Sequence, residues 1–255
     1  MALAIENINK ISPWPFTVAT IIPAWKEPII AKVLAKFNEP LVDEIILVID
    51  EPSQETENLI NLIKTKIKPK LTIIRNHKRM GIGYAIRQGL THALEKGYEV
   101  VVVMAGNGKD DPKEIPRLLK KIEEGYDYVQ GSRYLPGGKC EILPISRRVF
   151  NKLWPLIWTI LTKKRQTEVT NGFRAYKTKI LRDPRININQ KWLDHYALEY
   201  YIHYKAIKLG YKHCEVPVSK IYPWAHKGGY SKIMPLKDWI HIILPPILLW
   251  LRIKK

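Results

Sequence analysis

The sequence predicts an α/β fold with a mostly parallel central sheet flanked by helices. Short β-branched runs such as residues 17–22 (TVATII) alternate with longer segments whose apolar residues recur every three or four positions. Residues 100–104 hold four valines and a methionine in succession, which is typical of a strand covered on both faces. Strands that alternate with helices imply right-handed crossovers, and therefore a parallel sheet with helices on both faces.

The first half of the chain supplies four strands and three helices in alternation. The predicted strands are apolar runs bounded by polar turns, at residues 17–22, 44–49, 71–74 and 100–104. The predicted helices show apolar residues at helical spacing, at residues 27–37, 55–66 and 81–96.

The second half is more irregular. Helices are predicted at residues 112–124, 146–162 and 192–209, a strand at 126–130 and an edge strand at 213–218. Residues 135–141 and 222–230 are expected to be loops, and residues 172–176 (GFRAY) interrupt the pattern. We divide the chain into one domain at 1–232, with a nucleotide half to about 112 and an acceptor half after it, and a tail at 233–255.

The composition departs from that of an average globular protein in its charge. There are 42 Lys and Arg residues against 24 Asp and Glu, a net charge of +18. Such an excess favours phosphate-rich partners, which include nucleic acid, an anionic membrane surface and a phosphorylated substrate. Cys140 and Cys214 lie far apart, which favours a reducing compartment over a disulfide framework.

The tail is the most apolar part of the sequence. Residues 239–253 (WIHIILPPILLWLRI) are shorter than the roughly 20 apolar residues needed to cross a bilayer. Tryptophans near both ends and a basic terminus suit a helix lying among lipid headgroups. We therefore expect a peripheral, monotopic protein with C-terminal amphipathic interfacial helices, located at the cytoplasmic face of a membrane. The alternative is an ordinary C-terminal helix docked on the core.

The central strand ends in a polar turn. Asn107, Asp110 and Asp111 follow the valine run directly, and the carboxyl ends of strands are where open α/β sheets bind ligands. The alternative is structural: Asp111 caps a helix whose first residue is Pro112.

Several motifs in this order resemble family 2 glycosyltransferases of the GT-A fold, and among them the dolichyl-phosphate mannose synthases and other polyprenyl-phosphate enzymes. Each motif is short, but all of them occur in family order over roughly residues 17–233. They are IIPAWKEP (21–28), VIDEPSQET (48–56), MGIGYAIRQGL (80–90), GSRY (131–134), SRRVFN (146–151), TNGFRAY (170–176), CEVPV (214–218) and GYSK (229–232).

The resemblance implies a nucleotide-sugar donor, UDP- or GDP-linked. Glu27 and Asp50 match the acidic residues that hold the base and ribose, and carboxylates suit ring N–H and hydroxyl donors. Arg79 stands beside the glycines of the third motif, where it would meet the diphosphate. The nucleotide-binding residues so implied are Pro23, Glu27, Asp50, Ser53, Arg79, Gly81, Gly106 and Asn107.

The central strand's end matches the family's metal-binding DxD segment, and here the sequence departs from the pattern. The two usual aspartates fall on Ala105 and Asn107. Mg²⁺ and Mn²⁺ prefer hard oxygen ligands, for which Asn107 and Asp111 are the candidates here. Lys109 would be an alternative source of positive charge. The segment is compatible with a weakly bound Mg²⁺ or Mn²⁺, with a metal-independent site and with an inactive site.

The acceptor half is basic at positions that match the family's lipid-phosphate contacts. The implied acceptor-phosphate residues are Ser132, Arg147, Arg148, Ser231 and Lys232, and the implied catalytic residues are Arg133, Arg174 and Asp111. Arginine forks and a Ser–Lys pair supply directed donors and charge to phosphate. Glu168 would position Arg174 or a sugar hydroxyl, and Glu215 would form a structural salt bridge. Because the basic residues fall on these motifs, we do not expect a nucleic-acid partner.

The reaction implied is an inverting transfer in which a polyprenyl phosphate oxygen attacks the anomeric carbon of a nucleotide sugar. The phosphate is already anionic, so positioning and charge stabilisation suffice. The helix with Trp154 and Trp158 would join the tail in docking at the membrane. Two alternatives remain: a glycosyltransferase acting on a soluble hydroxyl, with Asp194 or Glu199 as base, and a noncatalytic nucleotide-sugar or membrane-binding relative.

Overall fold

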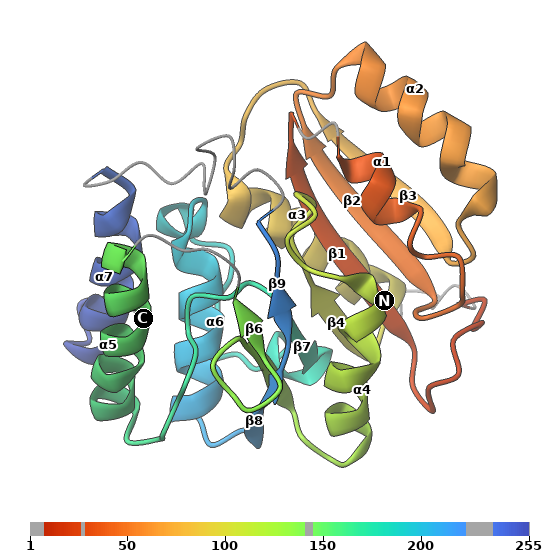
Figure 1. The fold of residues 1–255 in the computed structure, drawn as a ribbon. Coiled ribbons are helices and arrows are strands. Elements are labelled where there is room, and N and C mark those ends of the chain that lie inside the picture. The colour runs from red at the N-terminus through yellow and green to blue at the C-terminus, as the bar shows by residue number, and fades with distance from the viewer. Residues whose placement is uncertain (1–7, 27–28, 141–144, 223–236, 255) are drawn as a thin grey trace.

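The computed structural model describes residues 8–26, 29–140, 145–222 and 237–254, without the side chains of 145–148 and 237–241. A seven-stranded sheet lies at the centre of these residues (Figure 1). Its spatial order is β3-β2-β1-β4-β7-β5-β8. The strands are β1 (Val18–Trp25), β2 (Glu44–Asp50), β3 (Lys70–Asn76), β4 (Val100–Val103), β5 (Tyr128–Ser132), β7 (Arg174–Lys177) and β8 (His213–Pro217).

The sheet is parallel except for one inserted strand. β7 pairs antiparallel with both β4 and β5, and every other pairing in the sheet is parallel. The predicted mostly parallel sheet is confirmed. The interpretation of residues 172–176 as a mere interruption was wrong, since Arg174–Lys177 form the strand that joins the two halves. A four-residue strand with charged ends has no apolar run by which to recognise it.

Helices follow the predicted alternation, with changes at the ends. The α-helices are α1 (Ile30–Leu34), α2 (Gln54–Ile63), α3 (Ile82–Lys96), α4 (Ile115–Glu123), α5 (Ile145–Thr162), α6 (Ala197–Lys208) and α7 (Lys237–Trp250). The short 3-10 turns are η1 (Lys64–Lys66), η2 (Pro112–Glu114), η3 (Thr178–Ile180) and η4 (Lys191–Leu193). A second, two-stranded parallel sheet pairs β6 (Lys139–Cys140) with β9 (Ser219–Lys220).

Other predicted elements also differ from the observed ones. The first helix is shorter than residues 27–37, because it ends at Leu34 and the buried Phe37 lies beyond it. The predicted loop at 135–141 contains β6, which exists only through its pairing with β9. The predicted helix at 192–209 is divided into η4 and α6.

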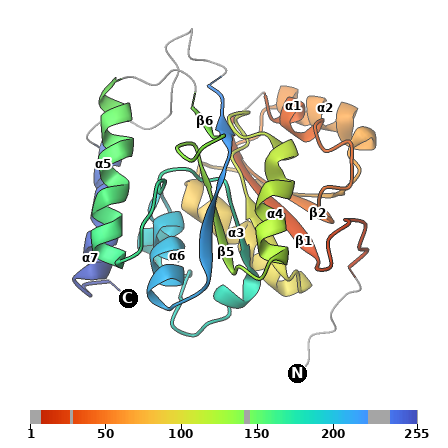
Figure 2. The same cartoon turned by 60° about the horizontal axis from the view of Figure 1, so that its bottom comes forward.

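Helices cover both faces of the sheet, and each face has its own apolar core. Alternate valines of β4 point to opposite sides, with Val101 and Val103 in one core and Val100 and Val102 in the other. The first core contains side chains of α3, α5, α6 and α7, and the second those of α1, α2 and α4. Figures 1 and 2 show α3 and α4 on opposite sides of the sheet. The continuous valine run follows from this double coverage.

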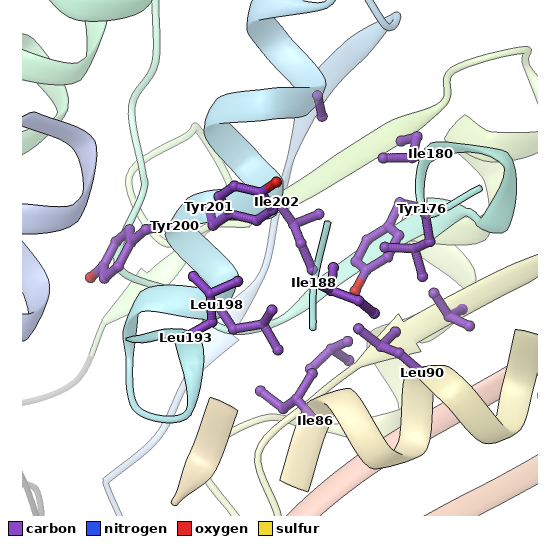
Figure 3. Close-up of a cluster of buried hydrophobic side chains, with 14 of the residues drawn as sticks. Ile86, Leu90, Tyr176, Ile180, Ile188, Leu193, Leu198, Tyr200, Tyr201 and Ile202 are labelled. Carbon is purple, nitrogen blue, oxygen red and sulfur yellow. The ribbon is translucent and has the colours of Figure 1, made fainter. Parts of the chain in front are cut away.

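The first core joins the two halves of the chain. Figure 3 shows Ile86 and Leu90 of α3 close to Tyr176 of β7 and Leu193 of η4. Burying each large aliphatic side chain contributes about 1.5–3 kcal/mol. Residues before and after position 112 therefore share one core.

The C-terminal segment forms a helix that packs beside α5 and α6 (Figures 1 and 2). Ile242 and Leu249 of α7 are buried in the first core. The docked-helix alternative thus describes α7, and its role at a membrane interface stays a prediction. Among the described residues, no helix combines the length and apolar character needed to span a bilayer.

Candidate active site

The loop after β4 is held together by Asp110. This carboxylate is 1% exposed. One oxygen accepts from the backbone N–H of Ala105 at 2.9 Å, and the other accepts from the Lys220 ammonium at 2.7 Å. The same ammonium donates to Asn171 Oδ1 at 2.7 Å. Lys220 therefore ties the end of β4 to the TNGFRAY segment.

Asp111 has the structural role that its place before a proline suggests. It is the N-cap of η2, accepting from the Lys113 N–H at 3.2 Å, with Pro112 at the start of the turn. Its other oxygen pairs with the Lys36 ammonium at 3.2 Å. The cap alternative is confirmed, and the catalytic role of Asp111 stays a prediction.

Gly106 and Asn107 complete this loop. A Cβ at Gly106 would lie 2.9 Å from the carbonyl oxygen of Pro23, so the structure brings these two predicted residues together at the ends of β4 and β1. Asn107 Oδ1 accepts from the N–H of Lys109 at 3.3 Å. In the described part of the chain, no cluster of three or more His, Cys, Asp or Glu side chains is arranged to hold a metal ion.

Asp50, at the carboxyl end of β2, binds the neighbouring loop. One oxygen accepts from Asn76 Nδ2 at 2.8 Å, and the other from the backbone N–H groups of Met80 and Gly81 at 2.8 and 3.3 Å. Ser53 caps α2 by accepting from the Thr56 N–H at 3.1 Å. Both residues shape this edge of the sheet, and their contact with a nucleotide stays a prediction.

A stacked pair that sequence reasoning missed lies at the same edge. The Arg79 guanidinium sits 3.8 Å from the centre of the Trp25 ring. The Trp25 indole donates to Glu51 at 2.8 Å, and this hydrogen bond, together with Lys26, lowers the Glu51 pKa. Trp25 in the first motif, IIPAWKEP, was the sequence feature that could have indicated an aromatic partner for Arg79.

The backbone is strained next to this pair. Lys26 and Glu51 both have positive φ angles, 45° and 48°. For a residue with a Cβ this left-handed conformation costs about 1–2 kcal/mol. Such strain is concentrated at ligand sites, and here it occurs where β1 and β2 end.

The glycines of the third motif approach protein backbone. A Cβ at Gly81 would lie 2.5 Å from the carbonyl oxygen of Asp194, and one at Gly83 would lie 1.9 Å from that of Leu193. The space beside these two glycines is thus taken by the segment before α6. Asp194 itself pairs with Arg87, so one of the two candidate bases of the soluble-acceptor alternative is engaged in an ion pair.

Arg133 and Glu168 form a buried ion pair. Their side chains are 4% and 0% exposed, and Arg133 Nε donates to Glu168 at 2.6 Å. The guanidinium also donates to Thr170 Oγ1 at 2.6 Å and to the Tyr222 hydroxyl at 3.1 Å. Burial alone would raise the Glu168 pKa, but Arg133 outweighs it and the pKa is lowered. The expectation that Glu168 positions Arg174 was wrong, because its charged partner is Arg133.

Arg174 lies in the core between β7 and α6. It is 3% exposed and donates to the carbonyl oxygens of Val169, Asn171 and Glu199 and to the Tyr128 hydroxyl, at 2.7–3.1 Å. These hydrogen bonds hold the TNGFRAY segment against β5 and α6. Its direct contact with a lipid phosphate stays a prediction.

Two further predicted residues are held by hydrogen bonds. The buried Ser132 hydroxyl lies 2.7 Å from that of Thr167. Glu215 accepts from the backbone N–H groups of Thr167 and Glu168 at 2.9 Å each. Its partners among the described residues are backbone amides and the Thr167 hydroxyl, so these hydrogen bonds stand in place of the expected salt bridge. Glu27, Ser231 and Lys232 lie outside the described residues, as do the side chains of Arg147 and Arg148.

The site so assembled runs along the carboxyl edge of the sheet, from Trp25 and Asp50 to Asp110 and Arg133. Residues 20–183 match the family model for glycosyl transferase family 2. The chain belongs to this family. By this membership it is classed with the family 2 glycosyltransferases.

Relatives named as polyprenyl-phosphate enzymes are about three tenths identical to this chain over the aligned residues. The undecaprenyl-phosphate mannosyltransferase of Micrococcus luteus is 31% identical over 151 residues, which cover 59% of this glycosyltransferase and 61% of that protein. The polyprenol monophosphomannose synthase of Mycolicibacterium smegmatis is 29% identical over 150 residues, 59% and 56% of the two chains. The chain thus spans about three fifths of these relatives' length.

Longer matches extend over most of the glycosyltransferase. An uncharacterized protein of Methanocaldococcus jannaschii is 32% identical over 211 residues, 79% of this chain and 87% of that one. A mycobacterial protein of known structure has a TM-score of 0.59 at 18% identity, over 94% of this chain and 76% of that one. Mannosyl-3-phosphoglycerate synthase of Rubrobacter xylanophilus scores 0.55 at 14% identity, over 93% and 74%. These likenesses confirm the GT-A fold.

Proposed function

We propose that this glycosyltransferase moves a sugar, with inversion, from a nucleotide sugar to a polyprenyl phosphate at a membrane surface. The named relatives support a polyprenyl-phosphate acceptor. The structural observation that carries the proposal is an exposed apolar face on α5, in the acceptor half.

This α5 face is a stripe of large apolar side chains on one side of the helix. Five residues at helical spacing are 42–74% exposed, namely Val149, Leu153, Leu156, Ile157 and Ile160. Trp154 and Trp158 point the other way and are buried in the first core, so the helix would dock through this stripe and not through its tryptophans. A contiguous exposed apolar stripe marks a surface that another apolar phase covers.

The charges around the α5 face select an anionic bilayer as that phase. Lys152, Lys163, Lys164 and Arg165 are exposed, and residues 145–167 include no Asp or Glu. On the neighbouring α7, Leu244 and Trp250 are exposed, and Arg252 and Lys254 follow. Cations beside apolar side chains are the composition that binds anionic headgroups and inserts below them.

The chemistry asks little of a general base. A phosphate monoester carries negative charge at neutral pH, so its oxygen is already a nucleophile, and the protein's task is to orient both substrates and stabilise the departing diphosphate. The pairing of Asp194 with Arg87 is consistent with this mechanism, since it commits a carboxylate that a hydroxyl acceptor would need as a base.

Transfer is tested directly with labelled UDP- and GDP-sugars and a short polyprenyl phosphate. We expect label in the organic phase, and Arg79→Gln should reduce it by at least about tenfold if the Trp25–Arg79 pair holds the donor. Arg182→Gln, which changes another exposed arginine, is the matched control. Label found only in a water-soluble acceptor would support the soluble-hydroxyl alternative, and nucleotide binding without turnover would support the noncatalytic one.

Membrane docking is tested by flotation with phosphatidylglycerol vesicles and with neutral phosphatidylcholine vesicles. Leu156→Ser combined with Ile160→Ser should weaken binding to the anionic vesicles by about 100-fold, at roughly 1.5 kcal/mol per lost side chain. Leu62→Ser removes a leucine that is 72% exposed on α2 and should leave binding unchanged. Equal loss in both variants would refute the α5 face as the docking surface.

A further inference from the structure

The loop after β4 does not fit a divalent cation. Ala105 has no side-chain ligand, and Asn107 supplies one neutral oxygen that already accepts from a backbone N–H. Asp111 caps η2 and pairs with Lys36. Both oxygens of Asp110 are bonded, one of them to the Lys220 ammonium. Mg²⁺ and Mn²⁺ need several hard oxygen ligands, and every carboxylate of this loop already has a cation beside it.

Lys220 occupies this corner as a fixed cation. Its residue is 9% exposed, and its ammonium lies 2.7 Å from both Asp110 Oδ1 and Asn171 Oδ1. The next residue of the chain, Ile221, donates its N–H to the carbonyl oxygen of Lys109 at 3.0 Å, which fixes β9 against the loop. The lysine is therefore anchored by backbone as well as by its side chain.

The charge balance of this arrangement is that of a metal site. A divalent cation on two aspartates has a net charge of zero, and so has one ammonium on one aspartate. An ammonium has three N–H donors, and two of those of Lys220 are used by described residues. No described residue accepts from the third donor, which is available to an anion at the carboxyl edge of the sheet.

We infer that the diphosphate of the donor is bound at this corner without a divalent cation, and that Lys220 donates a hydrogen bond to it from its place between Asp110 and Asn171. The inference rests on the proposed use of a nucleotide sugar. It identifies Lys220 as a donor-binding residue, and it accounts for the loss of the DxD carboxylates, because a second aspartate would leave the corner negatively charged.

Binding of UDP and GDP to the full chain tests this inference. Calorimetry should give the same affinity, within about twofold, in millimolar Mg²⁺ and in excess EDTA. Mn²⁺ added to the protein alone should keep the electron paramagnetic resonance spectrum of the free ion, and Mn²⁺ added with either nucleotide should keep the spectrum that the same mixture gives without protein. Lys220→Met should weaken nucleotide binding in EDTA by at least about tenfold, and Lys113→Met, which changes an exposed lysine near the loop, should not.

A double variant separates the two things that Lys220 does. Lys220→Met with Asp110→Asn removes both charges and avoids a buried unpaired carboxylate. If Lys220 binds the diphosphate, the double variant stays as weak as the single one. If Lys220 only neutralises Asp110, the double variant recovers wild-type affinity, and the inference is overturned.

Three other results would overturn it. They are stoichiometric Mn²⁺ binding by the wild type, a loss of nucleotide affinity in EDTA of tenfold or more (about 1.4 kcal/mol of binding free energy), and no binding of either nucleotide. None of these readouts involves the lipid acceptor. Metal-independent nucleotide binding without transfer to polyprenyl phosphate would thus reject the proposed function and support the role of Lys220.

Discussion

The buried pair of Arg133 and Glu168 gives the sharpest stability prediction. Glu168→Gln keeps the shape of the side chain but places an amide beside the guanidinium, which is then buried without a counter-charge. Removing one partner of such a pair costs about 3–5 kcal/mol. At about 2–4 °C per kcal/mol for a domain of this size, Tm should fall by at least about 6 °C.

The assay is a double-mutant cycle measured by urea denaturation. Arg133→Met should cost a similar amount, and the double variant should cost at least about 1 kcal/mol less than the sum of the single changes. A surface ion pair contributes about 0–1 kcal/mol. If Glu168→Gln costs that little and the cycle is additive, Arg133 is not held by Glu168 and our account of this pair is wrong.

The same pair gives a pH dependence with a defined sign. Arg133 lowers the Glu168 pKa below that of the unfolded chain, so the unfolded state binds more protons in acid. The stabilisation is complete above about pH 4.3, the usual glutamate value, and is lost as the pH falls through the lowered folded value. In acid, the urea denaturation midpoint should therefore change less with pH in Glu168→Gln than in the wild type. An equal dependence on pH in the two proteins would contradict this assignment.

Three further predictions concern other parts of the core. Gly83→Ala places a Cβ 1.9 Å from the carbonyl oxygen of Leu193 and should lower the free energy of unfolding, measured with urea, by more than about 3 kcal/mol. In the control Gly125→Ala the new Cβ meets no atom within 4 Å, and the loss should be about 1–2 kcal/mol because of the positive φ at this position. Equal losses in the two variants would contradict the contact. Burial lowers the His203 pKa well below 6.5, so stability is complete above that pH and should fall below it by up to about 1.4 kcal/mol per pH unit, a slope that His203→Gln should reduce; an unchanged slope would refute it. Burial raises the pKa of the Cys214 thiol to about 12, so iodoacetamide at about pH 8 should modify it at least about 100-fold more slowly than free cysteine, as followed by mass spectrometry; a rate near that of free cysteine would be inconsistent with this environment.

The strands that sequence reasoning recovered are those whose burial can be seen locally. The valines of β4 and the apolar run of β2 are covered on both faces, and such coverage selects residues that any reader of the sequence recognises. β7 and β6 are different, because their residues become strands only by pairing with partners that lie far along the chain. No local pattern contains that information.

The site divides in the same way. Motif order placed Asp50, Asp110 and Arg133 along one edge of the sheet, and the structure brings them there. The ion-pair partners of these residues could not be predicted from the sequence, since Glu168 and Arg133 meet only through a tertiary contact. Lys220 gave no sequence signal at all, because its importance comes from Asp110, 110 residues earlier in the chain.

The antiparallel insertion of β7 sets an order for assembling the protein. β4 and β5 follow one another along the chain, but they do not pair with each other. Both pair with β7, which is synthesised later. Until residues 174–177 have left the ribosome, each presents an unpaired edge, the kind of surface on which nascent chains associate wrongly. The β3-β2-β1-β4 half can form early by local crossovers, but closing the sheet waits for α5 and the segment after it. We therefore expect the closing of the sheet between β4 and β5 to wait for β7, whose Arg174 then donates to the carbonyl oxygen of Glu199 on α6.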